Sequence, residues 1–351
     1  MAIPIQFKIS IFAAEMKKVA LIISCIVIIL SAMAAACIGV INVPWEAVWT
    51  ILGAKISGQP IPTEFATFEI AIWNLRIPRI LLSLLAGASL AICGASFQAI
   101  FRNPICDPYI LGISSGASLG AAIAIILGLN IFAFGITGMA LLTALLTLIL
   151  ILGIAYTGKR KTVETILLAG ITLNFLISAV ITMLMVLNQE SLEEIIFWTM
   201  GSFASATWIE VLGLTFVFLI GGFILFLNAK NLNIMQLGTE TAQTSGVNTQ
   251  LTTWVILIAS SIMIAATVAC CGVIGFIGLI IPHITRLLFG NNNRTIFAFS
   301  IVFGAFFCLA ADTIARTIAA PSELPVGSIT AIAGAPYFIF LLLTNRSKSI
   351  H

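Results

Sequence analysis

The sequence predicts an all-α integral membrane protein with ten transmembrane helices and both termini in the cytoplasm. Hydrophobic residues make up 60% of its 351 residues and charged residues only 8%, whereas a soluble protein carries about 25% charged residues. Apolar runs long enough to cross a bilayer recur along the chain, and the lysines and arginines are distributed unevenly between the connecting loops. The formal net charge of +3 is too small to indicate a nucleic-acid partner. We expect one transmembrane domain over residues 1–351.

Apolar runs of sufficient length recur ten times. A bilayer core about 30 Å thick is crossed by a helix of about 20 residues. The run from 252 to 289 contains three glycines and Pro282, which weaken a helix interior, so we expect two helices with a tight reversal rather than one long helix. The expected spans are 19–41, 77–101, 109–128, 133–157, 164–188, 209–228, 252–270, 272–289, 296–319 and 326–345.

The positive charges set the orientation. With both termini inside, twelve lysines and arginines face the cytoplasm and four lie on or near the outer side, which agrees with the positive-inside rule. The first run follows Lys17 and Lys18 and ends near Cys37, as a secretory signal does. It exceeds the usual apolar length of about 7–15 residues, so we expect it to be retained as a helix.

The spans contain almost no titratable groups. Asp312 is the only acid well inside a span, and Arg316 follows it at i+4, so we expect an intrahelical ion pair. Seven cysteines without paired spacing and only two histidines do not suggest a metal site. Ion-coupled carriers usually hold acids or histidines in mid-membrane. The pattern therefore favours a pore that takes its energy from a partner, with no catalytic residue and no resident cofactor.

One motif allows a catalytic alternative. Gly112-Ile-Ser114-Ser-Gly116 fits the G-x-S-x-G turn that presents a nucleophilic serine, which would make the chain an intramembrane serine hydrolase. However, Gly112, Gly116 and Gly120 also form a small-xxx-small ladder on one helix face, and such ladders let membrane helices approach closely. We favour helix packing.

Three polar segments are candidates for function. At the outer mouth, Arg76 and Arg79 oppose the positive-inside preference. They are either snorkelling interfacial side chains or, with Arg316, a docking point for carboxylates of an external partner. Residues 98–112, with two prolines, are expected to form a rigid reversal.

The third segment is the polar cytoplasmic loop at about 230–250. Within it, residues 237–247 predict a short helix with Thr239 as its cap, Glu240 in its first turn and Gly246 at its end. It is either a solvated loop or a rigid knob that fits a cleft in a cytoplasmic subunit.

Taken together, these residues resemble the FecCD-type permeases of ABC importers, which include vitamin B12, haem and ferric-siderophore permeases. The resemblance runs from about Trp73 to the C-terminus. The motifs that carry it, in order, are Arg76-Ile-Pro-Arg79, Gly94-Ala-Ser-Phe-Gln98, Arg102-Asn103-Pro104, Leu111-Gly112, Leu237-Gly238 with Glu240, Ala242 and Gly246, Gly275-Phe-Ile-Gly-Leu-Ile-Ile-Pro282-His283 with Arg286, Asp312 with Arg316, Leu324-Pro325-Val-Gly327 and Gly334-Ala-Pro336.

The resemblance implies a type II ABC importer permease in the bacterial cytoplasmic (inner) membrane. It implies a homodimer, two cytoplasmic ATPase subunits that bind ATP and magnesium, and an external substrate-binding protein, which is periplasmic or lipid-anchored and meets the three arginines. The coupling helix then includes Leu237, Gly238, Glu240, Ala242 and Gly246. The fifth span, starting at Val163 and Glu164, resembles the pore-lining helix with its cytoplasmic gate, although small hydroxyl residues stand there in vitamin B12 permeases.

The resemblance leaves the cargo open. It implies an iron chelate, namely a siderophore or haem, or cobalamin. The alternative is the same machinery carrying an oxyanion such as molybdate, and a self-sufficient secondary carrier is a further alternative from another class.

Overall fold

The computed structural model describes residues 5–39, 43–129, 135–157 and 163–345, and within these ranges the chain is helical without any strand. The all-α class is therefore confirmed for the described part of the chain. Each expected span corresponds to a helix. These helices are α1 (Ile5–Cys37), α4 (Ile77–Ile100), α5 (Ile113–Ile126), α6 (Gly135–Thr157), α7 (Val163–Leu187), α9 (Trp208–Met235), α11 (Thr249–Cys271), α12 (Ile277–Phe289), α13 (Asn293–Ala315) and α14 (Val326–Asn345).

Seven helices of the described chain are long and apolar enough to cross a membrane. Helices α5 and α12, and the stretch Val326–Phe340 of α14, are apolar but shorter than a full span. The break within 252–289 is as expected: α11 ends at Cys271, Gly272 adopts a φ of +69°, and α12 begins five residues later.

Several boundaries differ from the expected ones. Helix α9 continues to Met235, seven residues beyond the expected end at 228, so much of the predicted loop at 230–250 is helical. Helix α5 begins at Ile113 rather than at 109, because a 3-10 turn (Pro108–Leu111) and Gly112 at a φ of +70° precede it. At the end of α9, polar residues continue the helix. Before α5, a short turn interrupts the apolar run.

Two further helices, α2 (Trp45–Ser57) and α8 (Leu192–Thr199), are not among the expected spans because they are too short to cross a bilayer. Helix α4 begins at Ile77 as expected, but the helical backbone starts earlier. It continues α3 (Ala66–Glu69) through a π-helical segment (Ile70–Arg76).

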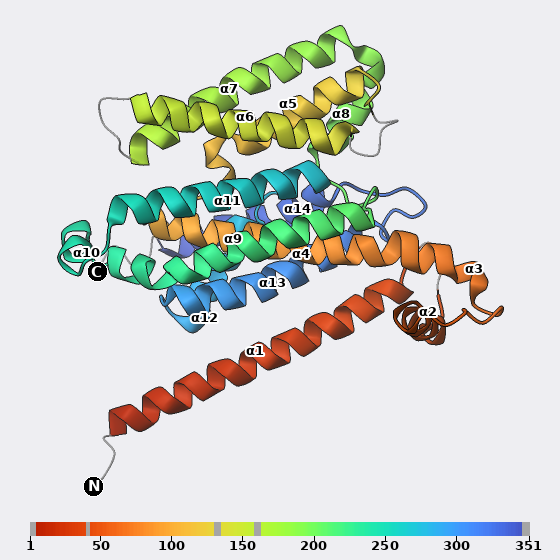
Figure 1. Cartoon of the computed structure of the whole chain (residues 1–351), viewed down its shortest axis with the longest axis horizontal. Helices are drawn as coiled ribbons and strands as arrows, with labels where there is room; N and C mark the ends of the chain where they lie inside the picture. The colour runs from red at the N-terminus through yellow and green to blue at the C-terminus, as the bar shows by residue number, and fades with distance from the viewer. Residues whose placement is uncertain (1–4, 40–42, 130–134, 158–162, 346–351) are drawn as a thin grey trace.

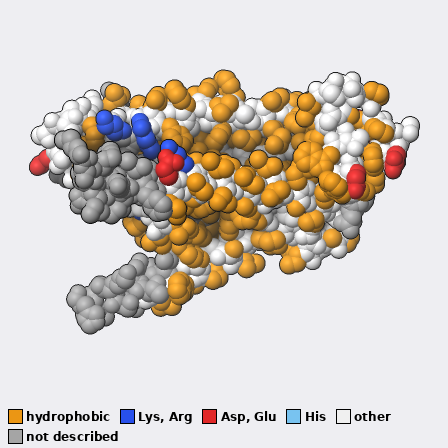
Figure 2. Space-filling view, turned by 90° about the horizontal axis from the view of Figure 1, so that it is seen from below, with side chains coloured by type: hydrophobic (Ala, Val, Ile, Leu, Met, Phe, Trp, Pro, Cys, Tyr) orange, Lys and Arg blue, Asp and Glu red, His pale blue; other side chains and the backbone are white. Residues whose placement is uncertain are grey.

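The helices form two groups, and α4 lies at the centre of the larger one. In Figure 1, α5, α6, α7 and α8 lie together beside a second group that includes α4, α9, α11 and α13, while α1 runs along the far edge against α13. The short helix α10 (Thr239–Thr244) lies at one end of the bundle, and α2 and α3 lie at the other. The surface in Figure 2 is apolar (orange) across its middle, and its charged side chains (blue and red) lie toward the two ends. This arrangement suits a bundle embedded in lipid.

Glycines permit the close crossings of α4. A β-carbon added at Gly87 would overlap the carbonyl oxygen of Gly304 on α13, and one added at Gly94 would overlap that of Gly278 on α12. Small residues at such crossings let membrane helices approach each other through their backbones.

Gly87→Leu is therefore expected to destabilise the protein by about 3 kcal/mol, because the α4–α13 crossing cannot accommodate a side chain. Thermal unfolding in detergent measures this effect. Gly213→Leu is the matched control, because the β-carbon of that residue on α9 would meet no atom within 4 Å. Equal midpoints for the two variants would contradict the packing argument.

Candidate functional site

The three arginines predicted to dock a partner lie near one another, but their partners are within the chain. Arg79 forms a bidentate ion pair with Asp312: its Nε lies 3.0 Å from both carboxylate oxygens and its Nη2 lies 2.8 Å from Oδ1. Its Nη1 also donates to Glu323 at 2.9 Å. The expected ion pair between Asp312 and Arg316 is wrong, because Arg79 on a neighbouring helix binds this carboxylate.

Arg76 and Arg316 hold the end of α1. Arg76 Nη1 donates to the carbonyls of Ala36 at 2.6 Å and Cys37 at 3.2 Å, and Arg316 Nη2 donates to the carbonyl of Ala35. The last carbonyls of a helix lack intrahelical partners and carry partial negative charge. These two arginines therefore cap α1 from outside.

The arginine cluster, meaning Arg76, Arg79 and Arg316 with Asp312 and Glu323, is thus largely closed to solvent. The arginines are only 9%, 8% and 5% exposed, whereas the side chain of Glu323 is 38% exposed. Glu323 is the member that solvent reaches most easily.

The π-helical segment before α4 has a local cause. Pro78 has no backbone N–H, so a carbonyl one turn earlier lacks its partner. The carbonyl of Trp73, five residues before Pro78, instead accepts the indole N–H of Trp208 at 2.9 Å. The two indole rings also pack, with centroids 4.8 Å apart. This contact fixes the segment before α4 against the start of α9.

At the opposite end, the α10 knob (residues 237–247) contains the predicted short helix. Gly238, at a φ of +132°, precedes the helix, and no side chain caps it. Thr239 is the first helical residue, so its predicted role as the cap is wrong. Glu240 lies exposed in the first turn, and Gly246 follows the helix at a φ of +82°, both as predicted.

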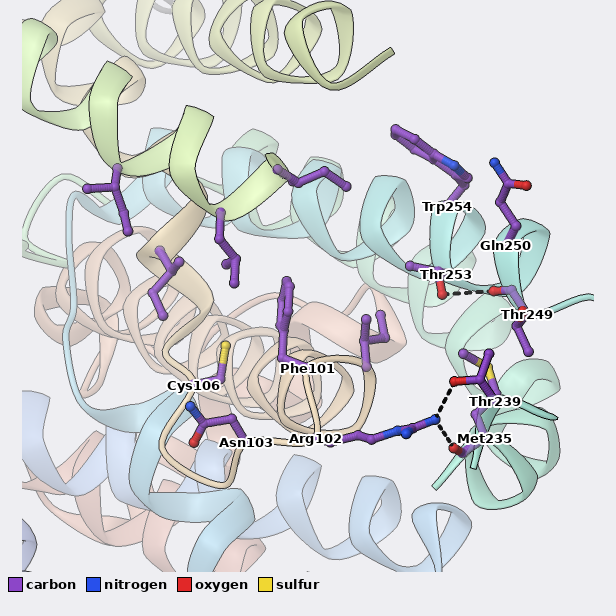
Figure 3. Close-up of a pocket in the computed structure, with 15 residues that line it drawn as sticks. Phe101, Arg102, Asn103, Cys106, Met235, Thr239, Thr249, Gln250, Thr253 and Trp254 are labelled. Atoms are coloured by element: carbon purple, nitrogen blue, oxygen red, sulfur yellow. Dashed lines mark hydrogen bonds between the residues drawn. The ribbon is translucent and has the colours of Figure 1, made fainter. Parts of the chain in front are cut away.

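The knob is anchored by few contacts. Ala242 packs with Met235 and Val247 in a small cluster of buried residues separate from the main core, while Leu237 is 74% exposed. Arg102, in the reversal after α4, donates from Nη2 to the carbonyl of Met235 at 2.5 Å and to the hydroxyl of Thr239 at 3.2 Å. Figure 3 shows this side chain reaching across to both.

A cavity of about 990 Å³ lies between the knob, the reversal and α7. Figure 3 shows Arg102 and Thr239 on one side of it and Trp254 of α11 on another. Its lining combines apolar and polar side chains: Ile100, Phe101, Arg102, Asn103, Cys106, Ile110, Ile166, Leu167, Ile171, Met235, Thr239, Thr249, Gln250, Thr253 and Trp254. The knob is therefore separated from α7 by open space.

Hydrogen bonds hold the predicted reversal between α4 and α5. The carboxylate of Asp107 accepts from the backbone N–H of Tyr109 at 2.7 Å, and the phenol of Tyr109 donates to the carbonyl of Ile274 at 3.0 Å. Burial raises the pKa of Asp107 to about 6, although the hydrogen bond from Tyr109 opposes this shift. These bonds tie the reversal to the segment between α11 and α12.

The glycine ladder lies at helix contacts. A β-carbon on Gly116 or Gly120 would overlap the hydroxyl of Thr147 or Thr143 on α6. Gly112 meets α7, where its added β-carbon would lie 2.9 Å from the carbonyl of Gly170. This geometry supports the packing interpretation.

The hydrolase alternative finds no support. Both ring nitrogens of His283 are buried without a hydrogen-bond partner in the described structure, so His283 does not hold the hydroxyl of Ser114. In the same described ranges, no group of three or more His, Cys, Asp or Glu side chains could hold a metal ion.

For the predicted gate, α7 begins at Val163, but the side chains of Val163 and Glu164 lie outside the described residues.

Comparison with known proteins identifies the class of protein to which the chain belongs. A solved chain described as a metal-chelate type ABC transporter, in an inward-facing conformation, matches with a TM-score of 0.80 and 31% identity over 93% of this chain and 99% of its own. The fold is therefore that of an ABC transporter permease. The model of the FecCD transport family matches residues 19–344, and the chain belongs to this family.

Named relatives differ in what they transport. The cobalamin import permease of Halobacterium salinarum is 37% identical over 88% of this chain and 82% of its own. The hemin transport permease of Yersinia pestis is 34% identical over 92% and 95%. The molybdate import permease of Haemophilus influenzae is 32% identical over 89% and 92%.

Proposed function

We propose that the chain is the permease subunit of an ATP-driven importer and forms a dimeric pathway for an iron chelate or cobalamin. The observation that carries this proposal is the arrangement of the two ends within a FecCD-family fold. A weakly anchored knob projects at one end and a charged mouth lies at the other. Little in the described spans could bind a cargo strongly, which suits a pore that releases what it receives.

The proposed assembly is based on the FecCD family's resemblance to ABC importers. Two copies of the chain, each with ten spans and cytoplasmic termini, line the pathway in the bacterial inner membrane. Two ATPase subunits below bind ATP and magnesium and engage the α10 knob, and an external binding protein delivers the cargo above. The permease itself needs neither a resident cofactor nor nucleic acid. In this proposal residues 1–351 form one transmembrane permease domain.

An iron chelate or cobalamin is the favoured cargo, because two of the three named relatives import a large metal-containing ring. The molybdate relative, at similar identity, is the reason for keeping an oxyanion as the second candidate. Purifying the permease with its bound external protein and identifying the ligand by mass spectrometry tests the choice. Finding a metal chelate would support the favoured cargo, whereas finding molybdate would favour the oxyanion instead.

Docking requires an exchange of carboxylates at the outer mouth. The guanidinium of Arg79 is shared between buried Asp312 and accessible Glu323. We infer that a carboxylate of the binding protein takes the place of Glu323, while the pair with Asp312 persists.

Glu323→Gln is therefore expected to tighten capture of the binding protein about threefold to tenfold at low salt, because the internal competitor loses its charge. Surface-based binding to the reconstituted permease measures the affinity. Glu64→Gln, also exposed at the outer end, is the control. Weaker capture by the Glu323 variant would contradict the exchange.

A further inference from the structure

We propose that Arg102 is a positioning residue that carries movement of the α10 knob to helix α7. This inference rests on the proposed function, because it concerns how the ATPase would drive the pathway. It assigns a role to a side chain in the reversal that the sequence identifies only as a rigid connection.

The backbone at Arg102 favours a different residue. Arg102 follows the end of α4 with a φ of +48°, and the N–H of Asn103 closes the turn onto the carbonyl of Gln98 at 3.2 Å. Glycine is the usual residue at such a helix terminus, because it adopts positive φ without steric cost. An arginine in a strained backbone conformation points to a use for its side chain.

That side chain joins two elements at the point where the knob leaves the bundle. The same Nη2 donates to Met235, the last residue of α9, and to Thr239, the first residue of α10. The cavity opens beside these contacts, so side-chain packing does not fill the space between the knob and α7. The guanidinium runs along one side of this cavity and joins the reversal to the start of the knob (Figure 3).

From Arg102 the connection continues to α7 through closely packed backbone. The reversal is stiffened by its two prolines and by the bonds of Asp107 and Tyr109. At its end, a β-carbon on Gly170 of α7 would lie 2.8 Å from the carbonyl of Ile110. Rigid elements in direct contact can transmit a displacement, and measured coupling is the evidence that they do.

Arg102→Gly tests the proposal, because glycine suits the backbone and removes only the side chain. In proteoliposomes with the ATPase and binding protein, we expect thermal stability and ATP hydrolysis within twofold of wild type. The amount of cargo moved per ATP should fall at least tenfold. A merely structural arginine would change stability and leave this ratio unchanged.

Two further variants sharpen the result. Thr239→Val removes one acceptor and should lower the ratio less than Arg102→Gly, with no added loss in the double variant. Arg294→Gln, at an exposed arginine on α13, should leave the ratio unchanged. A wild-type ratio in Arg102→Gly, or additive losses in the double variant, would overturn the proposal. Absence of ATP-dependent uptake by the wild type would instead refute the proposed function.

Discussion

Arg79→Ala is expected to lower the free energy of unfolding by about 3–5 kcal/mol, because it leaves the buried carboxylate of Asp312 without its partner. Asp312 is fully buried within α13, and Arg79 contacts both of its oxygens. A charge inside a membrane protein without a partner is costly. Removing one member of the pair should therefore damage the fold more than removing both.

The thermal unfolding midpoint in detergent measures this effect. Arg79→Ala should show a large drop, and the double variant Arg79→Ala/Asp312→Asn should recover a substantial part of it. Glu323→Gln is the control, because its carboxylate is accessible to water and its loss should change the midpoint little. A double variant no more stable than Arg79→Ala would contradict the assigned pairing. Replacing Arg79 with glutamate is a poor test of docking. The new carboxylate would lie beside those of Asp312 and Glu323, and their repulsion would damage the fold.

The second large effect concerns the α10 knob. Gly246→Pro is expected to lower cargo uptake at least tenfold while ATP hydrolysis by the assembled complex persists. Proline cannot adopt the φ of +82°, and it removes the N–H that Gly246 donates to the carbonyl of Gln243 at 3.0 Å. The knob should then change its conformation, and Ala242 should lose its packing against Met235.

Uptake and hydrolysis measured on the same proteoliposomes give the result. Gly58→Pro is the matched control, since Gly58 ends α2 at the opposite end of the bundle from α10, with a φ of +70° and a similar backbone bond. It should leave the amount of cargo moved per ATP unchanged. Equal loss of that ratio in both variants would point to general damage rather than to the knob.

Glu240→Lys tests the same surface without altering the backbone. Glu240 is exposed and has no ion-pair partner among the described side chains, so the variant should fold normally. If an ATPase engages this face, its affinity for the permease should fall several-fold in a pull-down assay. Unchanged affinity would remove Glu240 from the interface.

Much of the fold could be predicted because an apolar run of about 20 residues indicates a membrane-spanning helix. The interruption at Gly272 separates α11 from α12 as expected, since glycine there adopts positive φ. Helices α2 and α8 were beyond prediction by a rule based on bilayer thickness, because they do not span it. The extension of α9 to Met235 was missed because asparagines and Lys230 resemble a loop in composition.

The site was predicted less completely because its partners are distant in sequence. The i+4 rule selected Arg316 for Asp312, whereas the actual partner, Arg79, lies 233 positions away. Likewise, the hydroxyl of Thr239 accepts from Arg102 across 137 positions instead of capping its own helix. The sequence drew attention to Arg76, Arg79 and Arg316, but only the packed structure shows which groups they bind.

The central claim is that this chain forms a pathway whose energy comes from a separate ATPase. The most direct test reconstitutes it in proteoliposomes with the ATPase and binding protein that co-purify with it, and follows cargo uptake with each component omitted in turn. Uptake should require ATP, the ATPase and the binding protein together. Equal uptake by the chain alone, without ATP, would show a self-sufficient carrier and contradict the claim.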